Sequence, residues 1–307
     1  MKLLSQLRYI DVVAKKGSIR KAADSLNITS TALNRRILSL EEEIGSPLFE
    51  RLPQGVRLNT AGELLIQHIR KSISDLSRVT SQIADLSGVR SGHVTIASGA
   101  EIVGNFLPRR IAAYRQDFPD VSFEILRRPP EAAMKALSDF NADFALIFGP
   151  VPASEFQILL SVDIAVVVAM TKAHPLASLP ELSLFDCASY PAILPADGSG
   201  LYDVLLNAQR LRGVTLTNAI TSESFEFMAH YAQEEEVISF MLALDGLSKK
   251  DAGYQTIIRK PLRAADAIEG RLHIVQNKNR VLSVAAAKFI EQLTQHLYKI
   301  LPDNVRQ

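Results

Sequence analysis

The sequence is poor in the residue type from which disulfides and many metal clusters are built. Cys187 is the only cysteine among 307 residues. One cysteine excludes an intramolecular disulfide and a cysteine-based metal cluster within one chain. We interpret Cys187 as a buried and inert thiol. The alternative is a reactive sensing thiol, which would have no resolving partner in the same chain.

Long apolar runs are also missing. Stretches such as 164–170 have the length of a strand, whereas a membrane-spanning helix needs roughly 20 apolar residues. The N-terminus has no signal-peptide core, so we expect a cytoplasmic protein without a membrane segment. At 47% hydrophobic residues, the chain is far from disordered compositions and long enough for one large or two modest cores.

The sequence has little net charge, only +1, but the charges are unevenly distributed. Residues 1–60 contain ten basic and six acidic side chains, which gives +4 and leaves −3 for the remainder. A basic segment joined to a mildly acidic body is typical of a phosphate-binding module fused to a domain that does not contact DNA.

Residues 1–59 predict three short helices and a hairpin. An apolar pattern from Leu4 to Ala14 ends at Gly17, and Ser18 can cap a second helix over 19–26. Thr29 can cap a third helix with a stripe of Leu33, Ile37, Leu40 and Ile44 that ends at Gly45. A turn over 53–55 between two short strands predicts a β-wing. This order of elements is a helix-turn-helix followed by a wing.

The outer face of the third helix has side chains that can recognise bases. Asn and Arg can bond bidentately to adenine and guanine edges, and hydroxyl groups can contact bases or phosphates. For any single arginine, a solvated surface position remains the alternative. The predicted DNA-contacting residues are Ser18, Arg20, Thr29, Ser30, Thr31, Asn34, Arg35, Arg36, Arg51 and Arg57.

Residues 60–90 predict one long helix. We expect Thr60 to cap it, with Glu63 completing a capping box. The mean spacing of its apolar positions is close to 3.5 residues, which is typical of a coiled coil. They are Leu65, Ile69, Ile73, Leu76, Val79, Ile83 and Leu86. We expect a homodimer through this seam. The alternative is that the helix packs on its own domain.

Strand and helix patterns alternate over residues 91–307 in two series. The first includes 94–96, 106–115, 121–126, 132–139 and 144–148. The second begins near Asp163 and includes 164–168, 192–194, 201–210, 217–220, 225–233 and 237–240. A strand over 272–275 and a helix over 284–300 follow. This alternation predicts two α/β subdomains with mostly parallel strands, at about 91–161 with 267–307, and at about 162–266.

Several segments resemble the LysR-type transcriptional regulators. They are GSIRKAADSLNITSTALNRRILSLEEEIGSPLFERLPQGVRLNTAGELLI in the first third, and ADFALIFG at 142–149, HPLA at 174–177 and SESFEF at 222–227 further on. The resemblance implies an all-α winged helix-turn-helix module, with the helix from Thr29 in the major groove and the wing near the minor groove. It also implies a dimerising linker helix and a two-subdomain, periplasmic-binding-protein-like α/β effector domain. Ser30, Thr31 and Asn34 stand where many members have glutamine, proline and serine.

The topology predicts where an effector binds. Ligands of such folds lie at the carboxyl ends of strands, where helix N-termini present amide groups. For each residue, an ordinary turn or cap is the alternative. The predicted effector-contacting residues are Ser98, Gly99, Ala100, Glu101, Phe148, Ser199, Gly200, Thr221, Glu223 and Phe240.

Two departures from the family pattern concern this domain. Glu101 stands where many relatives have a small hydroxyl that suits a carboxylate ligand, so we expect an effector that is neutral and hydroxylated or that carries a cationic group. Glu234 and Glu236 stand near positions where relatives commonly have glycine, and we interpret that segment as a solvated acidic loop.

No catalytic constellation is visible, and we predict no enzyme activity, cofactor or metal. The GSG at 198–200 lacks the third glycine of a dinucleotide fingerprint, and the six histidines are scattered. The alternative function is an α/β small-molecule binding protein without a transcriptional role, which would leave residues 1–59 unexplained.

The predicted mechanism is a change of state on effector binding. The linker helix would transmit this change to the two DNA-binding domains of a dimer and alter the distance between them. DNA bending and contact with RNA polymerase would then change. The partners are therefore double-stranded DNA, a small-molecule effector, RNA polymerase and a second copy of the chain. The resemblance implies a homotetramer.

Overall fold

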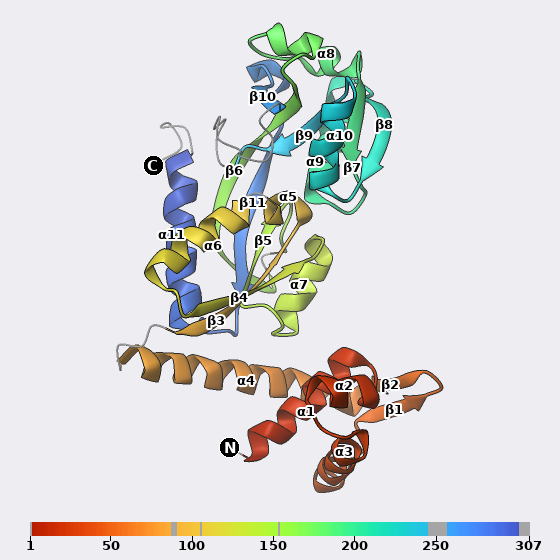
Figure 1. Cartoon of the computed structure of the whole chain (residues 1–307), viewed down its shortest axis with the longest axis vertical. Coiled ribbons are helices and arrows are strands. Elements are labelled where there is room, and N and C mark those ends of the chain that lie inside the picture. Colours follow the sequence, from red (N-terminus) through yellow and green to blue (C-terminus); the bar gives the residue numbers. More distant parts are fainter. Residues whose placement is uncertain (1, 87–90, 105, 153, 245–256, 301–307) are drawn as a thin grey trace. The chain divides into compact units, whose positions relative to one another are not determined.

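The computed structural model describes residues 2–86, 91–104, 106–152, 154–244 and 257–300 (Figure 1). The chain divides into an N-terminal unit, mainly residues 1–83, and a C-terminal unit that begins at residue 84. The elements of the N-terminal unit are α1 (Lys2–Lys16), α2 (Ile19–Ser25), α3 (Ser30–Ile44), β1 (Phe49–Leu52), β2 (Gly55–Leu58) and α4 (Thr60–Leu86).

The residues predicted to cap α2 and α3, and the glycine predicted to end α3, are confirmed in these roles. Ser18 and Thr29 have extended backbones, and their side chains accept hydrogen bonds from the first turns of α2 and α3. Gly45 ends α3 with a φ of 74°, in the left-handed region that glycine adopts without strain. Strands β1 and β2 pair antiparallel from Phe49 opposite Leu58 to Leu52 opposite Gly55. These residues form the predicted wing.

The cap of α4 differs from the expected capping box at Thr60. Asn59 caps the helix: its side-chain Oδ1 accepts from the Gly62 amide at 2.9 Å, and its carbonyl accepts from the Glu63 amide at 2.8 Å. Asparagine is as good an N-cap as threonine, and it stands one residue earlier. Residues 87–90, which we placed in the same linker, lie outside the described residues.

The apolar seam of α4 divides into two parts. Ile69 is fully buried, and Leu65 and Ile73 pack against the same core, which also holds Val13 of α1 and Leu33 of α3. Further along, the side chains of Leu76, Val79 and Ile83 are exposed by 40%, 39% and 59%. The first part of the predicted seam therefore belongs to the fold of its own unit, which was the alternative, and the second part is an exposed apolar stripe.

A buried ion pair ties α4 to α1. The Arg70 Nε lies 2.7 Å from Asp11 Oδ1, and Lys15 Nζ lies 2.8 Å from the other oxygen of the same carboxylate. The side chains of Arg70 and Asp11 are each only 11% exposed. Removing one partner of such a pair leaves a buried charge poorly compensated.

In the C-terminal unit the elements up to the middle of the sheet are β3 (Gly92–Ser98), α5 (Ala100–Val103), α6 (Phe106–Asp117), β4 (Val121–Arg127), α7 (Pro130–Ser138), β5 (Phe144–Phe148) and β6 (Phe156–Thr171). The remaining elements are η1 (Pro175–Ser178), α8 (Leu184–Ala188), β7 (Pro191–Pro195), α9 (Gly200–Arg212), β8 (Thr217–Ser222), α10 (Phe225–Glu234), β9 (Ile238–Leu242), β10 (Ile257–Pro261), η2 (Ala264–Asp266), β11 (Glu269–Asn277) and α11 (Val284–Ile300).

The strands form a sheet in the order β4-β3-β5-β11-β6-β9-β7-β8, with β10 paired to β6. The groups β4-β3-β5 and β9-β7-β8 are parallel, as predicted, but β6 and β11 run antiparallel to each other and to their neighbours. The expected subdomain limit at 161/162 falls inside β6, a single strand of 16 residues that belongs to both halves.

Alternating side chains place helices on both faces of the first half of the sheet. Ile96 and Phe144 pack in one core with Phe289 of α11, whereas Ala97 and Ala145 pack in another with Leu137 of α7 (Figure 1). This period of two is the ordinary consequence of the β-strand pleat. Glu234 ends α10, and Glu235 and Glu236 follow it in the loop; all three are exposed, which fits a solvated acidic segment.

Arg70→Met is expected to lower the stability of the N-terminal unit by about 1 to 3 kcal/mol, because Asp11 stays buried with only Lys15 to compensate it. Thermal unfolding of the full chain, followed by circular dichroism, measures the change. Lys71→Met, at an exposed position of the same helix, is the control and should leave the unfolding midpoint unchanged. Equal midpoints for both variants would contradict a stabilising role of the pair.

Candidate DNA-binding face and effector cavity

The N-terminal part of α3 is polar outside and apolar inside. Ser30, Thr31 and Arg35 are exposed, whereas Leu33 and Ile37 on the other face are buried in the core of the unit. The Thr29 hydroxyl accepts from the Ala32 amide at 3.2 Å and so is engaged in capping. A rigid helix with a buried back and exposed hydroxyl and guanidinium groups in front is suited to the major groove.

Several predicted DNA-contacting arginines bond to side chains of their own unit. The Arg51 Nη2 of the wing donates to Asn34 Oδ1 of α3 at 3.1 Å. Arg57 pairs with Glu50 across the hairpin at 2.8 Å, and this carboxylate raises the pKa of the guanidinium. The Arg36 guanidinium donates to the Tyr9 hydroxyl and lies 4.8 Å from the centre of its ring. The Arg51 bond joins the wing directly to α3.

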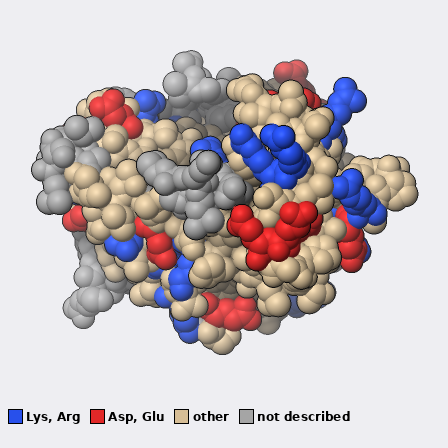
Figure 2. Space-filling view, turned by 90° about the horizontal axis from the view of Figure 1, so that it is seen from below, with Lys and Arg blue, Asp and Glu red and all other residues tan. Residues whose placement is uncertain are grey.

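Ser18 and Arg20 stand at the start of α2. The Ser18 hydroxyl accepts from the Lys21 amide at 3.4 Å as the cap of this helix, and Arg20 is exposed. On the face of the molecule shown in Figure 2, lysine and arginine side chains form several separate groups with acidic side chains between them. The basic side chains therefore do not form one continuous patch on that face.

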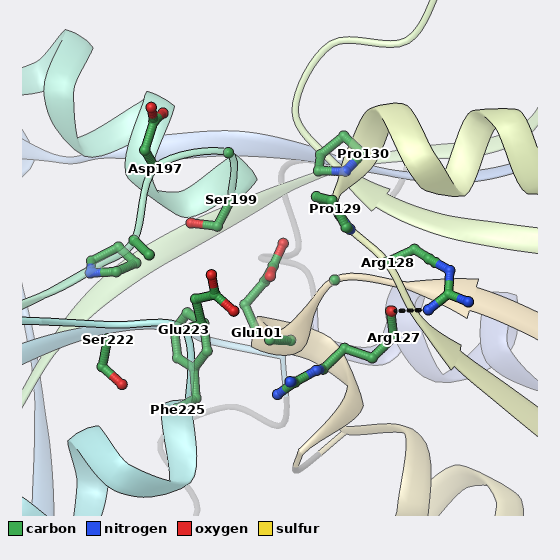
Figure 3. A pocket seen from close by; sticks show the side chains of 15 residues that line it. Glu101, Arg127, Arg128, Pro129, Pro130, Asp197, Ser199, Ser222, Glu223 and Phe225 are labelled. Atoms are coloured by element: carbon green, nitrogen blue, oxygen red, sulfur yellow. Dashed lines mark hydrogen bonds between the residues drawn. The ribbon is translucent and has the colours of Figure 1, made fainter. Parts of the chain in front are cut away.

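In the C-terminal unit, a cavity of about 300 Å³ opens at the carboxyl ends of the parallel strands. Loops after β3, β4, β7 and β8 form its walls (Figure 3). Its lining residues are Gly99, Ala100, Glu101, Arg127, Arg128, Pro129, Pro130, Pro195, Ala196, Asp197, Gly198, Ser199, Ser222, Glu223 and Phe225. This volume suits a small metabolite.

Glu101 is the most unusual group in the cavity. Both carboxyl oxygens are shielded from solvent, and neither has a hydrogen-bond partner. Burial raises the pKa of this carboxyl, and its own backbone amide opposes the shift to a smaller extent. The carboxyl folds back over Gly99, where a Cβ atom would collide with both oxygens.

Comparison with known proteins follows the same division of the chain. Residues 4–63 match the family model "Bacterial regulatory helix-turn-helix protein, lysR family", and residues 87–298 match "LysR substrate binding domain". The chain belongs to the LysR family. It is a DNA-binding transcriptional regulator with an effector-binding C-terminal domain, and it is not an enzyme.

One relative and two solved structures match the chain over nearly its whole length. It is 29% identical over 293 residues to the uncharacterized HTH-type transcriptional regulator YbhD of Escherichia coli strain K12, covering 94% of this chain and 90% of that one. A full-length variant of OxyR from Pseudomonas aeruginosa has the same fold, with a TM-score of 0.71, 18% identity and 96% and 94% coverage. Full-length CbnR in complex with its target DNA also has this fold, with a TM-score of 0.64 and 16% identity. The match covers 95% of this chain and 99% of that one.

The structure brings together five of the ten predicted effector contacts of this LysR-type regulator: Gly99, Ala100, Glu101, Ser199 and Glu223. The other five do not line the cavity. Ser98, Phe148, Gly200 and Phe240 are buried, and Thr221 is exposed and accepts from the Asn218 side chain at 2.9 Å.

The four buried residues are held in the interior by packing and hydrogen bonds. The Ser98 hydroxyl donates to the Leu146 carbonyl at 3.1 Å, inside the sheet. Phe148 lies against Gly200 and Gly270, where a Cβ atom would overlap its backbone oxygen and its ring, respectively. Phe240 is interior to β9 and pairs with Val168. These residues are buried in the interior of the domain and do not line the cavity.

Sequence reasoning missed the segment Arg127 to Pro130 and the aromatic Phe225. A signal for the former was present, because 121–126 was predicted as a parallel strand and ligands lie where such strands end. Phe225 begins α10, directly after Glu223 and Ser224.

Cys187 is buried, and burial together with Asp186 and Asp266 raises the pKa of its thiol to about 12. The thiol is therefore protonated at neutral pH, which agrees with an inert residue. Among the described residues, no three His, Cys, Asp or Glu side chains group as metal ligands. No helix within the described ranges is both long and apolar enough to cross a membrane.

Glu101→Gln is expected to raise the unfolding midpoint at pH 7. Because the folded-state pKa of Glu101 is raised, its stabilising contribution is greatest at low pH and is lost as pH rises through the folded pKa. The difference between variant and wild type should disappear near pH 4, where the carboxyl is protonated in both states. Differential scanning fluorimetry from pH 4 to 8 measures it. Glu181→Gln, at an exposed position between η1 and α8, is the control and should show no such trend.

Proposed function

We propose that this LysR-type regulator binds operator DNA as a homodimer and that an effector in the cavity of the C-terminal unit controls its activity. The observation that carries the proposal is the exposed polar face of α3, fixed on a buried core and joined to the wing through Asn34 and Arg51. We place base readout on Ser30, Thr31, Asn34 and Arg35, and phosphate contacts on Ser18, Arg20, Thr29, Arg36, Arg51 and Arg57.

The hydrogen bond between Asn34 and Arg51 supports a combined role for the helix and the wing. With its oxygen accepting from Arg51, the Asn34 amide nitrogen remains a donor toward acceptors in the groove. The wing arginine thereby orients a base-reading amide of α3. This arrangement supports reading by a winged helix-turn-helix and argues against a small-molecule receptor without a transcriptional role.

The exposed stripe of α4 supports dimerisation. Leu76, Val79 and Ile83 follow one another at spacings of three and four, on a helix whose earlier apolar residues are buried in its own unit. Exposed apolar side chains at this spacing suit the same stripe of a second copy. A two-fold dimer places the two copies of α3 on half-sites about one helical turn apart, or a multiple of it.

We further propose a homotetramer of two such dimers, the assembly that the family resemblance implies, acting in the cytoplasm on chromosomal DNA and RNA polymerase. Effector contacts are proposed for Gly99, Ala100, Glu101, Ser199 and Glu223, with Arg127 and Phe225 added from the cavity lining. Mapping the bound sites on genomic fragments, with and without candidate metabolites, tests the function as a whole. Absence of any preferred site would contradict it.

Arg35→Ala should weaken operator binding by about 1 to 3 kcal/mol, because Arg35 on the exposed face of α3 would lose a bidentate contact to a base. Fluorescence anisotropy with a mapped operator and with random duplex of equal length measures the two affinities. We expect little loss on random DNA. An equal loss on both would assign Arg35 to a phosphate.

The double variant Leu76→Glu with Val79→Glu should raise the dissociation constant of the dimer by roughly 100-fold or more, since four apolar side chains per dimer are replaced by charges. Sedimentation velocity over a concentration series measures it. Lys71→Glu, exposed on the same helix but outside the stripe, is the control and should sediment like the wild type. An unchanged dimer would contradict this interface.

A further inference from the structure

We propose that the effector is a small organic cation with N–H donors, an amine or a guanidine, bound between Glu101 and Glu223. This inference deepens the proposed function, on which it rests, by naming the ligand class of the cavity. It concerns a choice left open by the sequence, which allowed a neutral hydroxylated effector as well as a cationic one.

The first observation is the unsatisfied carboxyl of Glu101. Both oxygens are shielded from solvent and neither accepts a hydrogen bond from another residue, although Glu101 lines the cavity. Figure 3 shows the carboxyl directed into the space between Ser199 and Pro129. A buried acceptor without a donor is costly, and the cost is removed when a ligand supplies donors.

The second observation is that the hydrogen bonds of three polar residues in the cavity wall go to groups other than Glu101. Ser199 caps α9 by accepting from the Tyr202 amide at 3.1 Å. The Ser222 hydroxyl donates to the Ser224 carbonyl at 3.3 Å and accepts from the Ser224 amide at 3.0 Å. Arg128 donates to the Arg127 carbonyl at 2.9 Å. None of these bonds reaches the Glu101 carboxyl, and a bound ligand can supply the donors that it lacks.

The third observation is a second carboxylate on the same side of the cavity. Glu223 precedes α10 and lines the same cavity as Glu101. Asp197 adds another acid at the loop after β7. In Figure 3 the guanidinium of Arg127 lies at the opposite end of the Glu101 side chain from the carboxyl oxygens. The lining therefore carries three acidic and two basic side chains.

An ammonium or guanidinium group fits this region better than a hydroxyl does. An ammonium has three N–H donors and a guanidinium five, whereas an alcohol has one O–H. A positive charge in the cavity also stabilises the ionised form of the carboxyls that line it. Pro129, Pro130, Pro195 and Phe225 supply an apolar wall against which the carbon chain of such a ligand can pack.

Binding should be tested on the full chain with matched small probes. Pentylamine and 1,4-diaminobutane provide the cations, and butylguanidine provides the guanidinium. Pentanol and 1,4-butanediol are the neutral counterparts, and pentanoate and succinate are the anionic ones. We expect the cationic probes at 20 mM and pH 8 to raise the unfolding midpoint of the C-terminal unit by about 2 °C or more, as millimolar binding does. The neutral and anionic counterparts should have smaller effects.

The variants identify the site. Glu101→Gln and, separately, Glu223→Gln should weaken binding of the best cationic probe at least tenfold in calorimetric titration, while Glu124→Gln should leave it within twofold. Glu223 is exposed, so its variant tests the proposal even where Glu101→Gln does not fold. Retention of wild-type affinity in Glu223→Gln would overturn the assignment.

Binding of the cation should also strengthen as pH rises from 5 to 8, because Glu101 must lose its proton and burial holds its pKa high. The charged groups in the walls of the two adjoining cavities are Asp197, Glu223, Arg127, Arg128 and Arg259, and Glu226 approaches α5 at Gly104. The same titration at four pH values in Glu101→Gln should show a weaker dependence. An equal pH dependence in both proteins would contradict the role of Glu101.

Three results would overturn the ligand class: equal stabilisation by the alcohols, greater stabilisation by the carboxylates, or no stabilisation by any cationic probe at 50 mM. None of them affects the proposed regulatory function, because operator binding is measured separately by gel shift with the ligand-free protein. Failure of the gel shift with preserved binding of the amine would contradict the regulatory function alone.

Discussion

The antiparallel pairing of β6 with β11 is the interaction on which the effector domain depends. It runs from Phe156 opposite Asn277 to Ala165 opposite Glu269. Strand β11 also pairs with β5, and β6 also pairs with β9, so each half of the domain is hydrogen-bonded to the same two-stranded ribbon. The loops at the carboxyl ends of the two parallel groups meet in one cavity because of this ribbon.

Local signals made much of the fold predictable. Ser18, Thr29 and Gly45 lie at helix ends for reasons that involve only a few neighbouring residues, and the structure has them in those roles. The length of β6 was not predictable in the same way, because Phe156 to Thr171 alternates in burial at first and is continuously buried later. In a sequence, such a change of pattern looks like the border between two elements. In the structure the strand is continuous, and only its surroundings change, from half-exposed to buried.

The cavity was predictable in position and only partly in composition. The rule that ligands lie at strand ends selected Glu101, Ser199 and Glu223, which line the cavity. It could not tell that Ser98 and Phe240 face the sheet interior, since a shift of one residue turns a side chain to the other face. The seam of α4 shows the same difficulty: one apolar period serves first the core of the unit and then the exposed stripe, and periodicity alone does not distinguish the two.

Gly99 gives the cavity a constraint that extends beyond its own position. The Glu101 carboxyl occupies the space in which any side chain at residue 99 would begin. The constraint runs in one direction: residue 101 can change while glycine stays at 99, whereas any side chain at 99 would move the Glu101 carboxyl. A sequence that keeps the acid without the glycine would therefore hold its charge in another place.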